Sequence, residues 1–533
     1  MSEIEFGPEG INRSPQPVLL TPCTRTDSDV NHVAEECVPC LVQQDEDEPD
    51  QGQQPAKSMS TQLVEIALDR YELHISQDGY PFGIPTSGLI RTKPMAGSSR
   101  GLRTELAAQY YDLVGRTPSG SALSEALTTL EGMAFRSQPV DVHLRVARCD
   151  GRLFIDLGTA SGEFIEVDDQ GWRLVSNAPV HFRRSRLTGE LPVPIVGGSL
   201  EELWDIINVK ESLRPLILAA LVTGLFPDVP RPILAVTGEH GTGKTTAAKV
   251  LVTLIDPGPV PLRGAPKDLR EWPVMLHNSY AVGLDNVSFI SHEFSDALCR
   301  AVTGDGLVKR ELYSDLEVIP MSFQRMIVLN GIAFAELRGD LADRIVMCEV
   351  ERIDPSLMRT EQEHARLWEQ AHPRILGALL TLASQVMAKL PEIELVATPR
   401  MADYSRILAA VDEILGTSGF RTYDSIRGNR ASDAASADVV ATEILACIEV
   451  GFDGSSKQLM DRLDRDFHGS RRQRDWPSSP ARMTNHLKRI APVLRMAGWA
   501  IEDHFDPGHK VTKWRITPPA AQYVDPEDPW SDA

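Results

Sequence analysis

"RPILAVTGEHGTGKTTAAKVLVTLI", residues 231–255, is the stretch that decides the fold of this chain. A buried-strand pattern leads through a glycine loop into a helical pattern that begins at Lys244. Residues 238–245 match G-x-x-x-x-G-K-[ST] at every fixed position. Such glycines let backbone N–H groups turn inward around phosphate oxygens, and the positive end of the following helix adds to the attraction. The stretch therefore predicts an α/β P-loop core with a phosphate site.

We expect this loop to hold ATP together with Mg²⁺. Lys244 would reach the β- and γ-phosphates, and the hydroxyl of Thr245 would bind the metal. The expected cofactor-binding residues are Gly238, Glu239, His240, Gly241, Thr242, Gly243, Lys244, Thr245 and Thr246.

A second strand pattern, "YAVGLD", ends at Asp285, 41 residues after Lys244. A carboxylate at this place would lie beside the phosphates and hold the water shell of Mg²⁺. The next residue is Asn286, where a glutamate that activates water is usual. An asparagine can orient water but cannot take its proton, so either hydrolysis is slow or another carboxylate is the base. The candidates for that base are Glu239, Asp305 and Glu311.

A third strand pattern, "RMIVLN", ends at Asn330, which could hold the attacking water. Arg344 follows fourteen residues later. An arginine there can reach the γ-phosphate bound to a neighbouring subunit and stabilise transition-state charge. Arg338 is the alternative, and a surface ion pair with Asp340 or Asp343 is the competing interpretation of either arginine. We expect the catalytic residues to be Lys244, Asp285, Asn286, Asn330 and Arg344.

The C-terminal unit shows three helical patterns followed by two strands around the turn "DPGH". This order predicts a winged helix. Between Lys457 and Arg515 there are 13 Lys and Arg residues against 7 Asp and Glu, although the whole chain has a net charge of −21. Local basic charge on an acidic chain favours DNA binding by this unit, with protein binding as the alternative. The side chains expected to contact DNA on the outer face of the third helix are Arg482, Asn485, His486 and Arg489.

Composition limits the remaining possibilities. The seven cysteines are sparse and form no disulfide framework, the N-terminus does not resemble a signal peptide, and no apolar run is long enough to span a bilayer. We therefore expect a soluble cytoplasmic protein without a membrane partner. Within the N-terminal tail, Cys23, His32, Cys37 and Cys40 match no common zinc-finger spacing, so free thiols are expected and a zinc knuckle is the alternative.

The chain divides by pattern into six parts. Strands and helices alternate after residue 232, which predicts a parallel sheet covered by helices. The expected parts are a mostly disordered acidic tail (1–58), an α+β accessory domain (60–196), the ATPase domain (199–395), a helical connector (400–427), the winged helix (437–517) and a second acidic tail (518–533).

Residues 296–318, "DALCRAVTGDGLVKRELYSDLEV", lie between the second and third strands. The motif order resembles superfamily 3 helicases, which are similar to AAA+ ATPases, and in particular the helicase part of phage- and plasmid-type primase-helicases. The words "LDN", "DALCR", "LNGI", "DLADR", "ILGALL" and "PRMADY" also resemble a group of actinobacterial-type ATP-binding proteins. The resemblance covers about residues 140–425.

The resemblance implies a hexameric ring with ATP at the subunit boundaries. It also implies a hairpin whose Lys309 and Arg310 contact single-stranded or duplex DNA. Two features depart from it: no recognisable primase-polymerase domain precedes the core, and Asn286 replaces the usual second acidic residue. A separate primase, or a replication or defence partner, is therefore a possible partner.

Three functions stay open from the sequence. The first is a DNA-dependent ATPase and helicase-like motor of phage or mobile-element type. The second is a nucleotide-gated DNA-binding initiator, regulatory or phage-defence assembly protein that unwinds nothing. A small-molecule kinase is the third, for which no phosphoacceptor site is visible.

Overall fold

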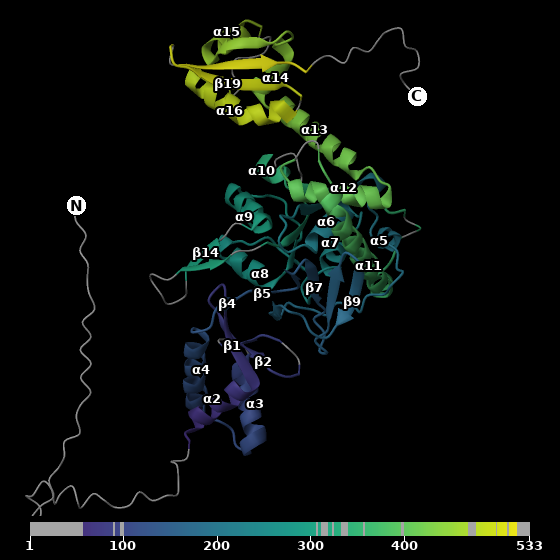
Figure 1. Cartoon of the computed structure of the whole chain (residues 1–533). Coiled ribbons are helices and arrows are strands. Elements are labelled where there is room, and N and C mark those ends of the chain that lie inside the picture. Colours follow the sequence, from purple (N-terminus) through teal and green to yellow (C-terminus); the bar gives the residue numbers. More distant parts are fainter. Residues whose placement is uncertain are drawn as a thin grey trace, which may run out of the picture. The chain divides into compact units, whose positions relative to one another are not determined.

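The computed structural model (Figure 1) describes most of the chain between residues 57 and 519. The tail with the four candidate zinc ligands lies outside the described residues, as do Asp305, Glu311 and Arg338. The described ranges are 57–88, 91–95, 101–304, 307–310, 318–321, 324–331, 339–354, 356, 358–395, 399–466, 476–496, 498–508 and 511–519.

A five-stranded sheet with the order β12-β13-β16-β11-β17 forms the centre of the chain, and all of its neighbouring strands are parallel. The predicted parallel sheet is thus confirmed. Its strands are β11 (Ile233–Thr237), β12 (Leu262–Arg263), β13 (Ala281–Leu284), β16 (Met326–Asn330) and β17 (Ile345–Glu349).

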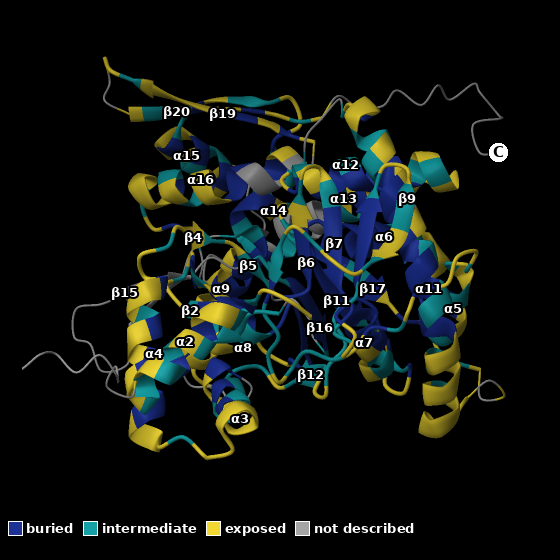
Figure 2. Cartoon of the chain, turned by 60° about the horizontal axis from the view of Figure 1, so that its bottom comes forward, coloured by how far each residue is buried: buried dark blue, intermediate teal, exposed yellow. Residues whose placement is uncertain are grey.

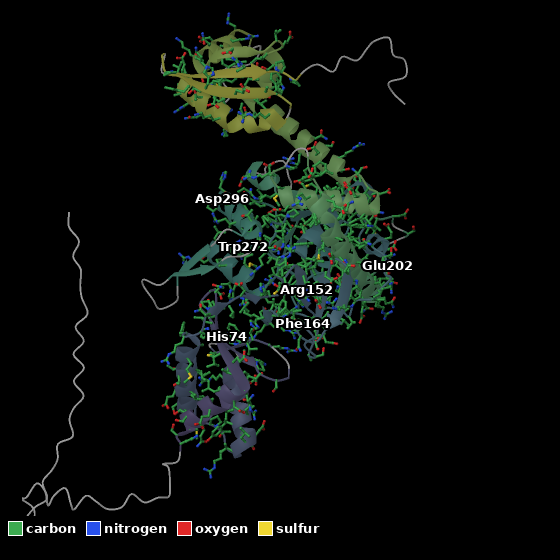
Figure 3. The ribbon with its side chains drawn as sticks, in the orientation of Figure 1. His74, Arg152, Phe164, Glu202, Trp272 and Asp296 are labelled. Carbon is green, nitrogen blue, oxygen red and sulfur yellow. The ribbon has the colours of Figure 1, made fainter. Side chains whose placement is uncertain are left out.

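Both faces of the central strands of this sheet are buried, and β11 and β16 are mostly dark blue in Figure 2. Because side chains alternate along a strand, Leu234 and Val236 join one apolar cluster while Ile233 and Ala235 join another. The second cluster holds the fully buried Trp272 (labelled in Figure 3), whose ring meets the edge of Phe294. The helices next to the sheet are α6 (Arg214–Gly224), α7 (Lys244–Thr253), α8 (Trp272–Asn278), α9 (His292–Thr303) and α10 (Gly339–Ala342).

Two four-stranded sheets lie before the core in the described residues, besides the short parallel pair of β5 and β10. One has the order β3-β2-β1-β4 and is accompanied by helices α2, α3 and α4. The other is the antiparallel meander β6-β7-β8-β9. An Asp-Gly turn joins β6 and β7, with positive φ at both Asp150 and Gly151. The bounds are α2 (Met59–Arg70), β1 (Tyr71–Ser76), β2 (Pro81–Pro85), β3 (Lys93–Pro94), α3 (Leu102–Val114), α4 (Gly120–Ala134), β4 (Pro139–Val140), β5 (Val142–His143), β6 (Val146–Cys149), β7 (Arg152–Asp156), β8 (Phe164–Asp168), β9 (Gly171–Val175) and β10 (His181–Phe182).

The meander does not belong to an independent accessory domain, although the sequence pattern placed a boundary between residues 196 and 199. Ile155 and Val167 lie in the same apolar cluster as Leu234 of the central sheet. The fully buried Arg145 forms an ion pair at 2.9 Å with Asp256, just beyond α7. A buried arginine without such a partner would be costly, so this pair ties the meander to the core.

Helices after the sheet continue the same core. The apolar faces of α11 (Glu361–Lys389) and α12 (Ala402–Leu415) pack in the cluster that holds Leu234. Glu202 of α5 (Glu201–Ile206; Figure 3) pairs with Arg374 of α11 at 2.5 Å. The predicted connector is therefore two helices, α12 and α13 (Gly419–Ala437), and both contribute to the core, the second through the buried Tyr423.

The C-terminal unit has its own apolar cluster, centred on the buried Trp514 and Leu487. Its order is helix, strand, two helices and a hairpin, with a sheet of order β18-β20-β19. The sequence pattern missed the short strand β18, which contains a glycine and only one large apolar residue. The bounds are α14 (Val439–Cys447), β18 (Phe452–Ser455), α15 (Ser456–Asp466), α16 (Pro480–Met496), β19 (Ala500–Asp506) and β20 (Val511–Thr517).

Candidate functional site

The loop between β11 and α7 has the backbone that its glycines predict. Gly238, Gly241 and Gly243 have φ values of 146°, 80° and 81°, a region that favours glycine. A Cβ atom on Gly238 would lie 2.5 Å from the carbonyl oxygen of Val350. The loop thus depends on glycine for its conformation, and at Gly238 also for space.

Lys244 begins α7 and its ammonium group lies over the loop. Its Nζ donates hydrogen bonds to the carbonyl oxygens of Gly238 at 2.9 Å and Glu239 at 2.6 Å. The hydroxyl of Thr242 donates to the same Glu239 carbonyl at 3.0 Å. The loop therefore curls around a positive charge, next to the positive end of a helix, which is the arrangement that attracts phosphate.

Three side chains meet at the carboxyl edge of the sheet. The hydroxyl of Thr245 donates to Oδ1 of Asp285 at 3.3 Å, and the amide nitrogen of Asn330 donates to the same oxygen at 2.5 Å. They come from α7, from the end of β13 and from the end of β16, whose carboxyl ends are adjacent because the strands are parallel. The structure thus brings together three of the residues that the sequence assigned to one site.

This oxygen-rich group fits Mg²⁺. Magnesium is usually held by one or two carboxylates together with waters and substrate phosphates, and Asp285 and Thr245 supply one carboxylate and one hydroxyl. Among the described residues there is no group of three or more His, Cys, Asp or Glu side chains that could form an all-protein cage. A metal here would need the phosphates to complete its ligands.

The contacts of Asn330 do not match the expected role of holding the attacking water. Its amide nitrogen is engaged with Asp285, and its side-chain oxygen accepts the backbone N–H of Asn286 at 2.7 Å. The residue is 3 % exposed. These contacts favour a role in positioning Asp285 over one in binding water.

Asn286 has a left-handed backbone, with φ of 53°. Asparagine and aspartate tolerate this conformation better than other residues with a side chain. Gly331 lies directly opposite, and a Cβ atom there would be 3.0 Å from the Cα of Asn286. The departure from glutamate at position 286 thus has a backbone explanation that the sequence pattern did not reveal.

Arg344 lies at the opposite edge of the sheet, immediately before β17. Its carbonyl accepts the N–H of Ile233 at the start of β11, so a full strand of about 13 Å separates it from the loop. Its side chain is 14 % exposed and pairs with Asp340 at 3.1 Å. It therefore cannot serve the loop of its own chain.

Arg400 shares this carboxylate and was missed by the sequence interpretation. It pairs with Asp340 and, at 3.6 Å, with Asp343, and its side chain is 44 % exposed. Burial alone would raise the pKa of Asp340, but the hydrogen bond from Arg344 and the charges of both arginines outweigh it and lower the pKa. The word "PRMADY" contains Arg400, but no local pattern connects it with Arg344.

The expected DNA contacts are partly described. Lys309 and Arg310 lie on β14 (Leu307–Arg310), opposite Ile319 and Val318 of the antiparallel β15 (Val318–Met321). Their side chains lie outside the described residues. The predicted hairpin is present at this place.

On α16, Arg482, Asn485 and Arg489 are exposed. His486 is not on this open face: its side chain is 11 % exposed, and its ring contacts Asp438 at 2.9 Å. The expectation that it contacts DNA directly therefore does not fit the structure, because the helix turns this ring toward the start of α14.

Together these features define an α/β protein with a glycine loop and an acidic edge beside it, followed by a small helix-and-hairpin unit. Comparisons with known proteins add two similarities to family models. Residues 200–433 match the model described as "Actinomycete integrative conjugative element replication protein", and residues 440–527 match the model described as "AICE RepA C-terminal domain". These similarities support a replication-associated role.

Other comparisons add little. A search of curated proteins found no match. The apo structure of the NrS-1 C-terminal region is similar at 11 % identity and a TM-score of 0.37, covering 86 % of this chain and 99 % of that one. The X-ray structure of JCV helicase is similar at 18 % identity and a TM-score of 0.23, covering 44 % of this chain and 66 % of that one. Likenesses this weak carry no argument about the present chain.

Within the described part of the chain, no helix has the length and apolar character needed to cross a bilayer.

Proposed function

We propose that this chain is a DNA-dependent ATPase of the superfamily 3 helicase type that acts in the replication of a mobile element. The observation that carries the proposal is the meeting of Thr245, Asp285 and Asn330 beside the loop of Lys244. A glycine loop alone binds many phosphates. A carboxylate held at the end of the neighbouring strand adds the Mg²⁺ partner that nucleotide hydrolysis needs.

Each group at the proposed nucleotide site has a separate role. Backbone N–H groups of residues 238–243 and the ammonium of Lys244 bind the phosphates. Thr245 and Asp285 hold Mg²⁺, which when bound neutralises charge on the β- and γ-phosphates. Asn330 fixes the carboxylate of Asp285 in place.

Arg344 acts on the nucleotide of a neighbouring subunit. Its distance from its own loop supports such a role, and a ring, hexameric by resemblance, would supply the neighbour. Pairing with Asp340 keeps the guanidinium group in a fixed direction. In this arrangement each site is complete only when two chains meet.

DNA would be contacted by β14 of the hairpin and by the C-terminal unit, which we take to be a winged helix with α16 as its recognition helix. The exposed Arg482, Asn485 and Arg489 suit phosphates and base edges. The match of residues 440–527 to the C-terminal domain of a replication protein supports this placement.

A second function deserves a test because of Asn286. Its side chain is exposed and cannot take a proton, and Glu239 is the one candidate base among the described residues. Slow turnover would suit a nucleotide-gated initiator that binds DNA without unwinding it.

Strand displacement on forked DNA separates the two functions. The motor predicts ATP-dependent unwinding that is lost in Lys244→Ala, with Lys249→Ala on the exposed side of α7 as the control. ATP-dependent assembly on DNA without unwinding would support the initiator. If the chain shows no ATP hydrolysis and no ATP-dependent assembly, both functions are rejected.

A further inference from the structure

Asp438 lies at the junction between α13 and α14 and is the N-cap of α14. Its carboxylate accepts the backbone N–H groups of Val440 at 3.0 Å and Ala441 at 3.1 Å. These bonds satisfy donors that a helix start leaves unpaired. The carboxylate is mostly buried, with 19 % of the side chain exposed.

His486 of α16 contacts the same carboxylate. Its Nε2 lies 2.9 Å from one carboxylate oxygen and 3.0 Å from the other. An ionised carboxylate only accepts hydrogen bonds, so Nε2 carries the proton in this assignment and Nδ1 of the neutral ring is an acceptor.

Arg489 completes the chain of contacts one helical turn further along. Its NH2 group lies 3.1 Å from Nδ1 of His486, to which it donates, and 3.6 Å from the carboxylate of Asp438. The side chain of Arg489 is 70 % exposed. One corner of the guanidinium group is thus held, and the remaining N–H groups can meet a ligand.

We propose that Asp438 and His486 are positioning residues that hold the guanidinium group of Arg489 in the direction from which it binds a DNA phosphate or base edge. The proposal rests on the DNA-binding function proposed for α16. Arginine has a long side chain, and holding it in its bound direction before association lowers the entropy lost on binding.

The pKa of Asp438 agrees with a charged carboxylate at this place. Burial raises it, but the hydrogen bonds from His486 and from the backbone of Ala441 outweigh burial and lower it. The side chains of Asp438, His486 and Arg489 thus form a series of a carboxylate, an imidazole and a guanidinium group.

A substitution at Asp438 tests the proposal because two effects oppose each other. Asp438→Asn keeps a side chain that caps helices as well as aspartate does, and it removes a negative charge near DNA. Simple electrostatics therefore predicts tighter binding, whereas loss of positioning predicts weaker binding, by about threefold to tenfold.

The experiment measures the affinity of the full-length chain for a fluorescent duplex of about 30 base pairs, over a range of salt concentrations. The variants are Asp438→Asn, Arg489→Ala and the double variant. We expect Asp438→Asn to weaken binding, and to have no further effect once Arg489 is alanine. As a matched control, Asp438→Asn should keep its effect in an Arg482→Ala background, because Arg482 contacts Ser478 and not Asp438.

A second variant protects the test against loss of folding. In His486→Gln the amide nitrogen can replace Nε2 as the donor to Asp438, but no acceptor stands in the place of Nδ1, so this variant should weaken binding to a similar extent. Tighter binding by Asp438→Asn, or a loss that persists without Arg489, would overturn the positioning role. If the unaltered chain shows no salt-dependent binding to the duplex, the DNA-binding function itself fails, and the proposal fails with it.

Discussion

The amide nitrogen of Asn330 lies 2.5 Å from the carboxylate of Asp285, and the amide oxygen of the same side chain holds the backbone of Asn286. One buried side chain thus connects the ends of β13 and β16 and fixes the only carboxylate that contacts Thr245 among the described residues. The geometry of the whole edge depends on this contact.

Replacing Asn330 by alanine should therefore damage both stability and catalysis. The buried backbone N–H of Asn286 loses its partner, which costs about 1–3 kcal/mol. Asp285 loses its orientation, and a misplaced catalytic group can lower the rate by roughly 10²-fold. ATP turnover at saturating Mg²⁺, measured on material shown to be folded by thermal denaturation, checks this. Undiminished turnover would mean that Asp285 needs no such support.

Two glycines of the loop offer a matched comparison. Gly238→Ala places Cβ 2.5 Å from the carbonyl oxygen of Val350, whereas Gly241→Ala meets no atom within 4 Å. Both variants place an alanine at a positive φ, which lowers the free energy of unfolding by roughly 1–2 kcal/mol. Gly238→Ala must also displace the backbone of Val350. We expect Gly238→Ala to abolish ATP binding and Gly241→Ala to weaken it only modestly. Equal losses would show that the steric argument is wrong.

The stability of variants at position 286 should follow the preference of the new residue for a left-handed backbone. Asn286→Gly should keep the stability of the chain, since glycine adopts φ of 53° freely. Asn286→Glu should lower the free energy of unfolding by about 1 kcal/mol. Denaturant titration of both variants decides this, and a glutamate variant that is more stable than the glycine variant would refute the backbone explanation.

A trans role for Arg344 predicts complementation. Lys244→Ala and Arg344→Ala should each abolish most ATP turnover when alone. Mixed together, they form interfaces that combine an intact loop from one chain with an intact arginine from the other, so part of the activity should return. Arg400→Ala, which shares Asp340, is the comparison variant. An inactive mixture of chains that still associate would contradict the shared site.

The pH dependence of stability has a specific source in His372. Burial lowers its pKa to about 4, and its ring lies 4.4 Å from that of Trp368 and 3.4 Å from the carbonyl oxygen of Leu254 at the end of α7. The unfolded chain binds a proton at His372 below about pH 6.5, while the folded chain does so only near pH 4. The free energy of unfolding should therefore decrease as the pH is lowered from about 6.5 to about 4, by up to about 3 kcal/mol.

His372→Phe keeps the stacking on Trp368 and removes this titration. Its free energy of unfolding should change less between pH 6.5 and pH 4 than that of the unaltered chain. The same slope in both proteins would assign the acid sensitivity to other groups.

The sequence predicted the parts of the site that local pattern controls. The glycines of residues 238–243 and the ends of the strands at Asp285 and Asn330 follow from short motifs, and parallel strands necessarily bring those ends together. The conformation of Asn286 could not be predicted, because it depends on Asn330 and Gly331 from the next strand. Arg400 and Asp438 were missed for a similar reason: each acts through partners distant in sequence.

The boundary between the accessory region and the core also could not be predicted from the sequence pattern. Alternating apolar residues and an Asp-Gly turn at residues 146–175 are typical of antiparallel strands, but they do not show what these strands pack against. That is decided by contacts such as Arg145 with Asp256, which are 111 residues apart.

Equilibrium binding of ATP to the whole chain is the most direct test of the nucleotide site. We expect association that requires Mg²⁺, that is lost in Lys244→Ala and that is strongly weakened in Asp285→Ala. Folded protein that fails to bind ATP, or that binds it equally well after both substitutions, would contradict the assignment of this edge of the sheet as a nucleotide site.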